Sequence, residues 1–251
     1  MKSALQLWSV QDAMKTDLLG TVEAVAQMGY AGVEFAGYFG VSAQALRQQL
    51  VASGLQVCGS HLALAQIQDH FDETLRYEDT IGNHLLVVPY LPVESATAWQ
   101  RTCEEMEALA RRVRAAGFQL AYHNHYHEFL SIPGQDLLDE LYQAAPSLEF
   151  EADLYWLAYS GVDIDAWVQA HRQRLVMFHM KDMAVVNGER ESVVLGTGTL
   201  PLVHYVDLAR QLGHTWSVVE QEAFTYQPPM VAAAQDATCL NRLLQSGEAR
   251  L

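Results

Sequence analysis

The stretch AWQRTCEEMEALARRVRAAGFQLAYHN, residues 98–124, predicts a helix followed directly by a buried strand. Four apolar residues recur at three- and four-residue steps in its first part: Met106, Leu109, Ala110 and Val113. Glutamate and arginine fill the positions between them, as on an amphipathic helix that buries one stripe. Gly117 then closes the helix, because the left-handed residue that ends a helix is favoured when it has no Cβ. The strand at Gln119–Asn124 ends in polar residues.

The same alternation of strand and helix occurs eight times along the chain. The expected strands are Ala4–Ser9, Gly32–Phe35, Gln56–His61, Leu85–Pro89, Gln119–Asn124, Leu148–Asp153, Leu175–His179 and Trp216–Glu222. Several of these strands are almost wholly apolar, which is typical of parallel sheets covered on both faces. Eight such units in 251 residues without a linker predict an α/β fold, a single (β/α)₈ TIM-barrel domain over residues 1–251.

An open doubly wound sheet is the alternative architecture for this alternation. That fold normally carries a glycine-rich phosphate-binding turn after its first strand. The first expected strand here leads into Trp8-Ser9-Val10-Gln11-Asp12, which contains no glycine. The closed barrel is therefore favoured.

The composition limits the partners and the compartment. The formal charge is −15 and half of the residues are hydrophobic. A nucleic-acid surface gains its affinity from Lys and Arg, so a nucleic-acid partner and an anionic membrane are not expected. The longest apolar runs are too short to span a bilayer. The three cysteines are unpatterned and read as reduced thiols, which predicts a cytoplasmic protein.

Ionisable residues gather at the ends of the expected strands. They are Glu34, His61, His123, His125, Glu151, Asp153, His179, Lys181, Glu220 and Glu222. In a barrel, these strand ends converge on one mouth, where the loops that carry chemistry begin. Imidazole and carboxylate together suit a divalent metal. We therefore predict a mixed histidine and carboxylate metal site at the mouth, although Glu151 also fits a solvated stretch that starts at Glu149.

Several motifs in this order resemble the sugar phosphate isomerase/epimerase family of xylose isomerase-like TIM barrels. Inosose dehydratases and type IV apurinic endonucleases are wider relatives of that family. The resemblance spans nearly the whole chain. It is carried by Gly29-Tyr30-Ala31-Gly32-Val33-Glu34-Phe35, Gly59-Ser60-His61, Tyr122-His123-Asn124-His125, Glu128-Phe129, Asp153-Leu154-Tyr155-Trp156, His179-Met180-Lys181-Asp182, Leu195-Gly196-Thr197-Gly198 and Val219-Glu220-Gln221-Glu222.

The resemblance implies a divalent metal ion (manganese, cobalt, zinc or magnesium) at the barrel mouth. Its implied ligands are His123, Asp153, His179 and Glu220. The first of these departs from the family, in which a glutamate usually ends strand five. His125 and Glu128 compete with His123 for that place. Thr197 is a second departure, since many relatives carry Glu between these two glycines.

The implied activity is that of a metal-dependent isomerase or epimerase, which deprotonates a keto sugar or sugar derivative to an enediolate and reprotonates it elsewhere. Candidate catalytic residues are His123, His125 and Glu222, and candidate substrate contacts are Gln6, Glu34, His61, Lys181 and Trp156. The partner is then a small carbohydrate. An anion site at the Gly196-Thr197-Gly198 turn stays open, and so does a homo-oligomer, because such barrels often pair through helices.

Three other functions stay open. A lyase of the same fold, of the inosose dehydratase or 3-keto-glycoside type, shares the first proton transfer, and the histidine-rich end of strand five favours it. A non-catalytic sugar-binding barrel would account for the missing glutamate of strand five. A metal-dependent nuclease is disfavoured by the charge of −15.

Overall fold

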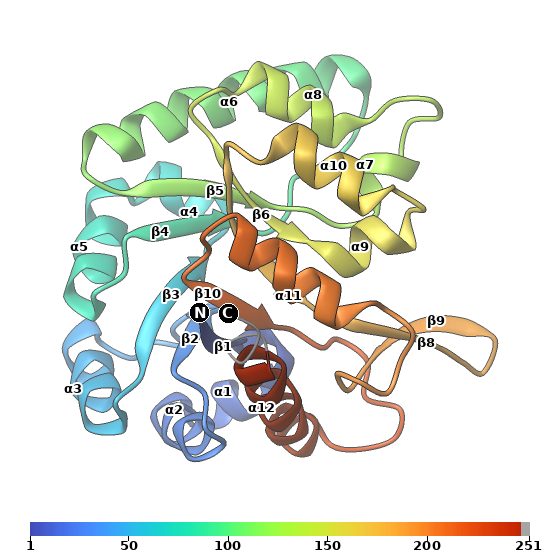
Figure 1. Ribbon diagram of the computed structural model, residues 1–251. Helices are drawn as coiled ribbons and strands as arrows, with labels where there is room; N and C mark the ends of the chain where they lie inside the picture. The colour runs from blue at the N-terminus through green and yellow to red at the C-terminus, as the bar shows by residue number, and fades with distance from the viewer. Residues whose placement is uncertain (247–251) are drawn as a thin grey trace.

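The computed structural model describes residues 1–246 as a closed parallel barrel wrapped by helices (Figure 1). The barrel strands are β1 (Lys2–Gln6), β2 (Gly32–Phe35), β3 (Gln56–His61), β4 (Leu85–Val88), β5 (Gln119–His123), β6 (Glu149–Asp153), β7 (Leu175–Met180) and β10 (Trp216–Val219). They follow the order β1-β10-β7-β6-β5-β4-β3-β2, and β1 also pairs with β2, which closes the ring. The predicted α/β TIM barrel is therefore confirmed.

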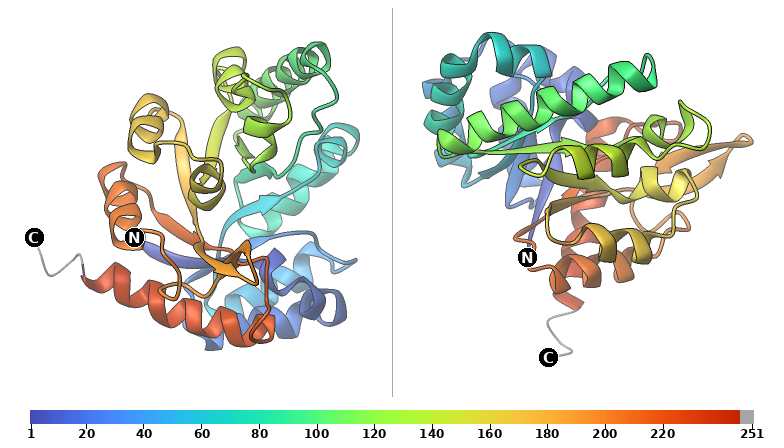
Figure 2. Two further views of the ribbon diagram at one scale, coloured as in Figure 1. Left: turned by 90° about the vertical axis from the view of Figure 1, so that its right-hand side faces the viewer. Right: turned by 90° about the horizontal axis from the view of Figure 1, so that it is seen from above.

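Helices surround the barrel, as both views of Figure 2 show. The longer ones are α2 (Leu18–Gln27), α3 (Ala43–Ser53), α5 (Phe71–Ile81), α6 (Ala96–Ala115), α11 (Leu202–Gln211) and α12 (Pro229–Ser246). The shorter ones are η1 (Leu7–Val10), α1 (Gln11–Thr16), α4 (Leu64–Asp69), α7 (His127–Leu130), α8 (Leu137–Ala144), α9 (Leu154–Tyr159) and α10 (Ile164–His171).

Helix α6 illustrates how the sequence sets an element and its packing. Its buried side chains include the expected stripe of Met106, Leu109, Ala110 and Val113. The hydroxyl of Ser95 accepts a hydrogen bond from Ala98 N and caps the first turn. Gly117 has φ 87°, the left-handed value that a glycine adopts without strain. These features orient β5, which follows at once.

Three segments differ from the expected strands by more than one residue. The last barrel strand, β10, ends at Val219 instead of continuing to Glu222. The first strand ends at Gln6, because Leu7–Val10 turns into a 3₁₀ helix instead of continuing to Ser9. A hairpin of β8 (Asp182–Val186) and β9 (Glu189–Val193) follows β7 and projects beyond the barrel at the right of Figure 1. The hairpin therefore stands beside the carboxyl ends of the barrel strands, on the face turned to the viewer in the left view of Figure 2.

The remaining general expectations concern thiols and membranes. Cys58 and Cys103 are buried, Cys239 is half-buried, and all three are free thiols. Within residues 1–246, none of the helices has the length and apolar character needed to cross a bilayer.

Candidate active site and metal centre

Strand register brings the ionisable residues to one level of the barrel. His123 on β5 lies opposite Glu151 on β6, and Asp153 on β6 lies opposite His179 on β7. Glu220 directly follows β10. All five residues are buried. Burial of so many ionisable groups is costly unless they pair with one another or with a cation, so their gathering points to a function.

The structure brings together the four residues that the resemblance suggests as metal ligands. His123 Nε2 lies 3.7 Å from Asp153 Oδ2 and 4.0 Å from Glu220 Oε2. His179 Nδ1 lies 3.1 Å from Glu220 Oε2. Two ligand atoms on one tetrahedral zinc ion lie about 3.3 Å apart, from bond lengths of about 2.0–2.1 Å. The spacing and the two-nitrogen, two-oxygen donor set therefore fit a divalent metal ion.

Lys181 shows that the two carboxylates of this set already face a cation. Its Nζ lies 2.7 Å from Asp153 Oδ2 and 2.6 Å from Glu220 Oε2, and it also pairs with Glu222. Burial alone would lower the pKa of Lys181, but Asp153, Glu220 and Glu222 outweigh it and hold that pKa well above its usual range. The side chain therefore stays charged and is fully buried beneath the mouth.

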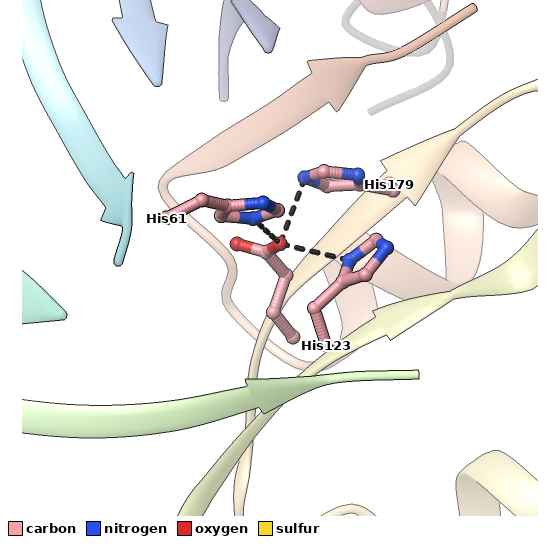
Figure 3. Close-up of side chains that lie close together, drawn as sticks. His61, His123 and His179 are labelled. Atoms are coloured by element: carbon pink, nitrogen blue, oxygen red, sulfur yellow. Dashed lines mark hydrogen bonds and ion pairs between the residues drawn. The ribbon is translucent and has the colours of Figure 1, made fainter. Parts of the chain in front are cut away.

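A second group of side chains, centred on Glu151 and here called the deeper layer, lies on the other side of His123 and His179 from Asp153 and Glu220. The rings of His61, His123 and His179 point toward one another (Figure 3). Their nitrogens lie 2.8, 3.1 and 2.8 Å from Glu151 Oε1. Glu151 is thus a buried partner of three histidines and not part of a solvated stretch.

Gln6 and Glu34, which the sequence suggests as substrate contacts, lie in this deeper layer. Both are fully buried. Gln6 Nε2 donates a hydrogen bond of 2.9 Å to Glu34 Oε2, which lies 2.7 Å from His179 Nε2. Burial raises the pKa of Glu34 to about 7, with a further contribution from Glu151. These residues therefore support the histidines from below.

The two other candidates for the strand-five ligand occupy different positions. Glu128 is buried but turns toward its own loop, where it accepts hydrogen bonds from Tyr122 Oη and His125 N. The ring of His125 lies 4.9 Å from that of His123, and its Nδ1 is buried without a partner. Burial and the charge of neighbouring groups lower the pKa of His125 to about 2, so this imidazole is neutral. Among these candidates, His123 stands nearest to the other ligands.

A cavity of about 360 Å³, here called the mouth cavity, opens above these residues. It is lined by Trp8, Ala36, His61, Pro89, Tyr90, His123, His125, Glu220 and Glu222. Trp8 and Tyr90 are 48% and 56% exposed, and the Glu222 side chain is 30% exposed. Trp156 stands nearby, with its ring 5.8 Å from that of His125. Aromatic walls over a few converging polar groups are typical of small-molecule sites.

The hairpin and the residues around Phe224 enclose another cavity, of about 410 Å³. Glu191 is the one carboxylate among its lining residues, and no histidine or lysine belongs to that lining, all of it within the described chain. The mouth cavity is smaller but holds the histidines and carboxylates. It is therefore the better candidate for catalysis.

The Gly196-Thr197-Gly198 turn binds a carboxylate of the chain itself. Asp182 Oδ2 accepts hydrogen bonds of 2.9 Å from both Gly196 N and Gly198 N, and Asp182 Oδ1 accepts one of 3.0 Å from Leu200 N. A Cβ on Gly198 would lie 2.4 Å from Asp182 Oδ1. These hydrogen bonds to Asp182 hold the turn after the hairpin in place. The amides of Gly196 and Gly198 are therefore not free to bind an external anion.

Asn124 is a supporting residue that the sequence reasoning did not assign. Its Oδ1 accepts a hydrogen bond of 2.9 Å from Asp153 N, and its Nδ2 donates one of 3.4 Å to Asp153 O. Buried Asn124 therefore fixes the backbone that carries one of the candidate ligands. Its position between two site histidines was the signal available in the sequence.

The fold agrees with a comparison to known families. A model of the xylose isomerase-like TIM barrel family matches residues 22–243, and the chain belongs to this family. A search of curated protein sequences found no match.

Solved structures extend this comparison. A sugar phosphate isomerase/epimerase from Parabacteroides distasonis is similar over 96% of this chain and 98% of its own, with 21% identity and a TM-score of 0.83. An IOLI protein with a bound zinc atom is similar over 98% of this chain and 99% of its own, with 13% identity and a TM-score of 0.75. The probable 3-DHS dehydratase AsbF from Bacillus anthracis covers 96% and 99%, with 14% identity and a TM-score of 0.74. At these identities the likeness concerns the fold.

Proposed function

We propose that this protein is a divalent-metal-dependent isomerase or epimerase that acts on a keto sugar or sugar derivative. The observation that carries the proposal is the four-residue cluster of His123, Asp153, His179 and Glu220, of which His123 and Glu220 line the mouth cavity. A divalent ion bound there would act as a Lewis acid on a carbonyl oxygen and its neighbouring hydroxyl. The sugar isomerase/epimerase among the similar structures supports the same class of reaction.

Two groups in the mouth cavity are available to move the proton. His125 follows β5 and Glu222 follows β10, and two other strands, β6 and β7, separate these in the barrel. The two groups therefore face the cavity from different sides. A neutral imidazole and a carboxylate both accept a proton from carbon, and the protonated form of either returns it.

The proton transfers define the products. One group removes the proton next to the carbonyl and generates an enediolate, and a group then returns a proton. Return to the former carbonyl carbon gives isomerisation, and return to the opposite face of the original carbon gives epimerisation. Lys181, held by three carboxylates, contributes positive charge beside Asp153 and Glu220.

A dehydratase or related lyase is the second candidate function. The rings of His123, His125 and His127 form a row, with centroids 4.9 and 5.8 Å apart, at the edge of the cavity. An imidazolium in this row would protonate a departing hydroxyl or glycosyl oxygen after the same first step. The two functions differ in their products.

Proton exchange tests the proposal. The protein, loaded with Mn²⁺, Co²⁺ or Zn²⁺, is incubated with a panel of ketoses and inososes in deuterium oxide, and the products are followed by NMR. Deuterium at the carbon next to the carbonyl supports the proposal, and an isomer, epimer or dehydrated product identifies the reaction. Absence of exchange with every metal and substrate, or equal exchange by an Asp153→Asn variant, would contradict it.

A further inference from the structure

The deeper layer of the site places the carboxylates of Glu34 and Glu151 against His123 and His179, the two histidines of the proposed metal site. We infer that Glu151 and Glu34 are positioning residues that fix the tautomers of His123 and His179, so that one defined ring nitrogen of each faces the metal ion. The inference rests on the proposed metal site. It does not depend on which reaction the metal supports.

His123 divides its two ring nitrogens between the layers. Its Nδ1 lies 3.1 Å from Glu151 Oε1, while its Nε2 faces Asp153 Oδ2 and Glu220 Oε2. A carboxylate only accepts hydrogen bonds, so the ring proton belongs on Nδ1. The lone pair of Nε2 is then free for a metal ion on the mouth side.

His179 shows the opposite arrangement with the same result. Its Nε2 lies 2.7 Å from Glu34 Oε2 and 2.8 Å from Glu151 Oε1, while its Nδ1 lies 3.1 Å from Glu220 Oε2. The proton on Nε2 satisfies the deeper carboxylates, and a metal ion bound at Nδ1 would take the place of the proton that faces Glu220 Oε2. A carboxylate behind a ligating histidine orients the ring and raises its basicity.

His61, His123, Glu151 and His179 also lie close enough together to hold a metal ion. Glu151 Oε1 fills the space among the three imidazoles, at hydrogen-bonding distance from a nitrogen of each. A cation in that space would have to displace this oxygen. Glu151 Oε1 therefore serves the histidines, while Glu151 Oε2 and Glu34 Oε1 are buried without a hydrogen-bond partner.

The neighbouring strands β1 and β3 fix the position of the Glu34 side chain. Gln6 Nε2 donates to its Oε2 from β1, and Gly59 lies opposite Glu34 on β3. A Cβ on Gly59 would stand 2.6 Å from Glu34 Oε1. Residue 59 therefore controls the position of this carboxylate without touching either ligand histidine.

Zinc affinity and histidine tautomers test the inference together. Competition with a chromophoric chelator gives the Zn²⁺ dissociation constant, and ¹⁵N NMR of the Zn²⁺-loaded, histidine-labelled protein gives the tautomers. We expect His123 protonated on Nδ1 and His179 on Nε2 in the wild type. Glu151→Gln and Glu34→Gln should weaken Zn²⁺ binding by about 10–100-fold. In the metal-free protein, Glu151→Gln should also weaken the preference of His123 for the Nδ1-protonated tautomer, because a neutral amide oxygen is a weaker acceptor than a carboxylate.

Two further variants separate positioning from damage to the fold. Gly59→Ala should weaken Zn²⁺ binding by displacing Glu34, and it serves as the decisive variant if a glutamine variant does not fold. Glu78→Gln is the matched control. Glu78 is an equally buried carboxylate, but it bonds to Tyr38, Ser60 and Asn83 and not to a site histidine. The Zn²⁺ affinity of the Glu78→Gln variant should equal that of the wild type.

The outcomes distinguish this inference from the proposed function. Opposite tautomers in the wild type, or a change in Zn²⁺ affinity below twofold in the folded variants, would overturn the inference and leave the metal site standing. The expected tautomers and affinities without any proton exchange on sugars would support the inference and contradict the proposed reaction. A wild-type protein that binds no Zn²⁺ would overturn both.

Discussion

Replacement of Lys181 by methionine should destabilise the metal-free protein more than any exposed substitution. The ammonium pairs with buried Asp153 and Glu220 and with partly exposed Glu222. Removing one partner of a buried ion pair leaves an uncompensated charge, at a cost of about 3–5 kcal/mol. Since about 1 kcal/mol changes Tm by about 2–4 °C in a chain of this size, Tm should fall by roughly 10 °C.

The same geometry predicts how metal and pH act on Lys181→Met. A divalent ion would replace the lost positive charge between the two carboxylates, so adding Zn²⁺ should raise the Tm of the variant by more than it raises that of the wild type. Without Lys181, the pKa values of Asp153 and Glu220 should rise, so the destabilisation should be largest near pH 8 and shrink as the pH falls.

Calorimetric unfolding in chelator and in Zn²⁺, at pH 8 and pH 5.5, measures both effects. Leu208→Met, a substitution of a partly buried leucine that packs against the core away from the site, provides the matched control and should keep a Tm near that of the wild type. A variant with the wild-type Tm in chelator, or with a smaller response to Zn²⁺ than the wild type, would refute the electrostatic reasoning.

Two other predictions concern the frame around the site. Gly198→Ala should lower the free energy of unfolding by about 1–3 kcal/mol, because its Cβ would lie 2.4 Å from Asp182 Oδ1 and Met183 O. Urea unfolding measures this free energy, and an unchanged value would contradict the expected steric clash. Asp236→Asn should stabilise the protein at pH 8. Burial raises the folded-state pKa of Asp236 from 3.8 to about 7, a change worth at most about 4 kcal/mol. The wild type therefore loses this stability as the pH rises from about 4 to 7, whereas the variant does not, so equal stabilities at pH 8 would contradict the assignment.

The ionisable residues at the strand ends could be assigned to one site from the sequence, because the chemistry of a barrel lies at the carboxyl ends of its strands. Alternation along β6 also places Glu151 and Asp153 on one face. Their depth along the barrel axis could not be predicted, since it is set by the register of His123 with Glu151 and of Asp153 with His179. A residue two positions deeper in the same strand contacts the histidines from below instead of facing the cavity.

Gln6 and Glu34 illustrate the same limit. Each ends its strand, as the sequence indicates, but their pairing across β1 and β2 turns them toward one another and away from the mouth cavity. The hairpin β8–β9, in contrast, had a local signal. Asn187 and Gly188 adopt positive φ values of 52° and 90°, and an Asn-Gly pair is a strong hairpin signal. The hairpin was not predicted, because the chain was divided into repeating strand–helix units.

Metal content tests the central claim most directly. The purified protein, dialysed against Zn²⁺, Mn²⁺ or Co²⁺ and then against metal-free buffer, is analysed by elemental mass spectrometry beside Asp153→Ala and Glu220→Ala. We predict one divalent ion per chain in the wild type and its loss in both variants. A wild type without bound metal, or variants that keep a full equivalent, would contradict the assignment of these residues as the metal centre.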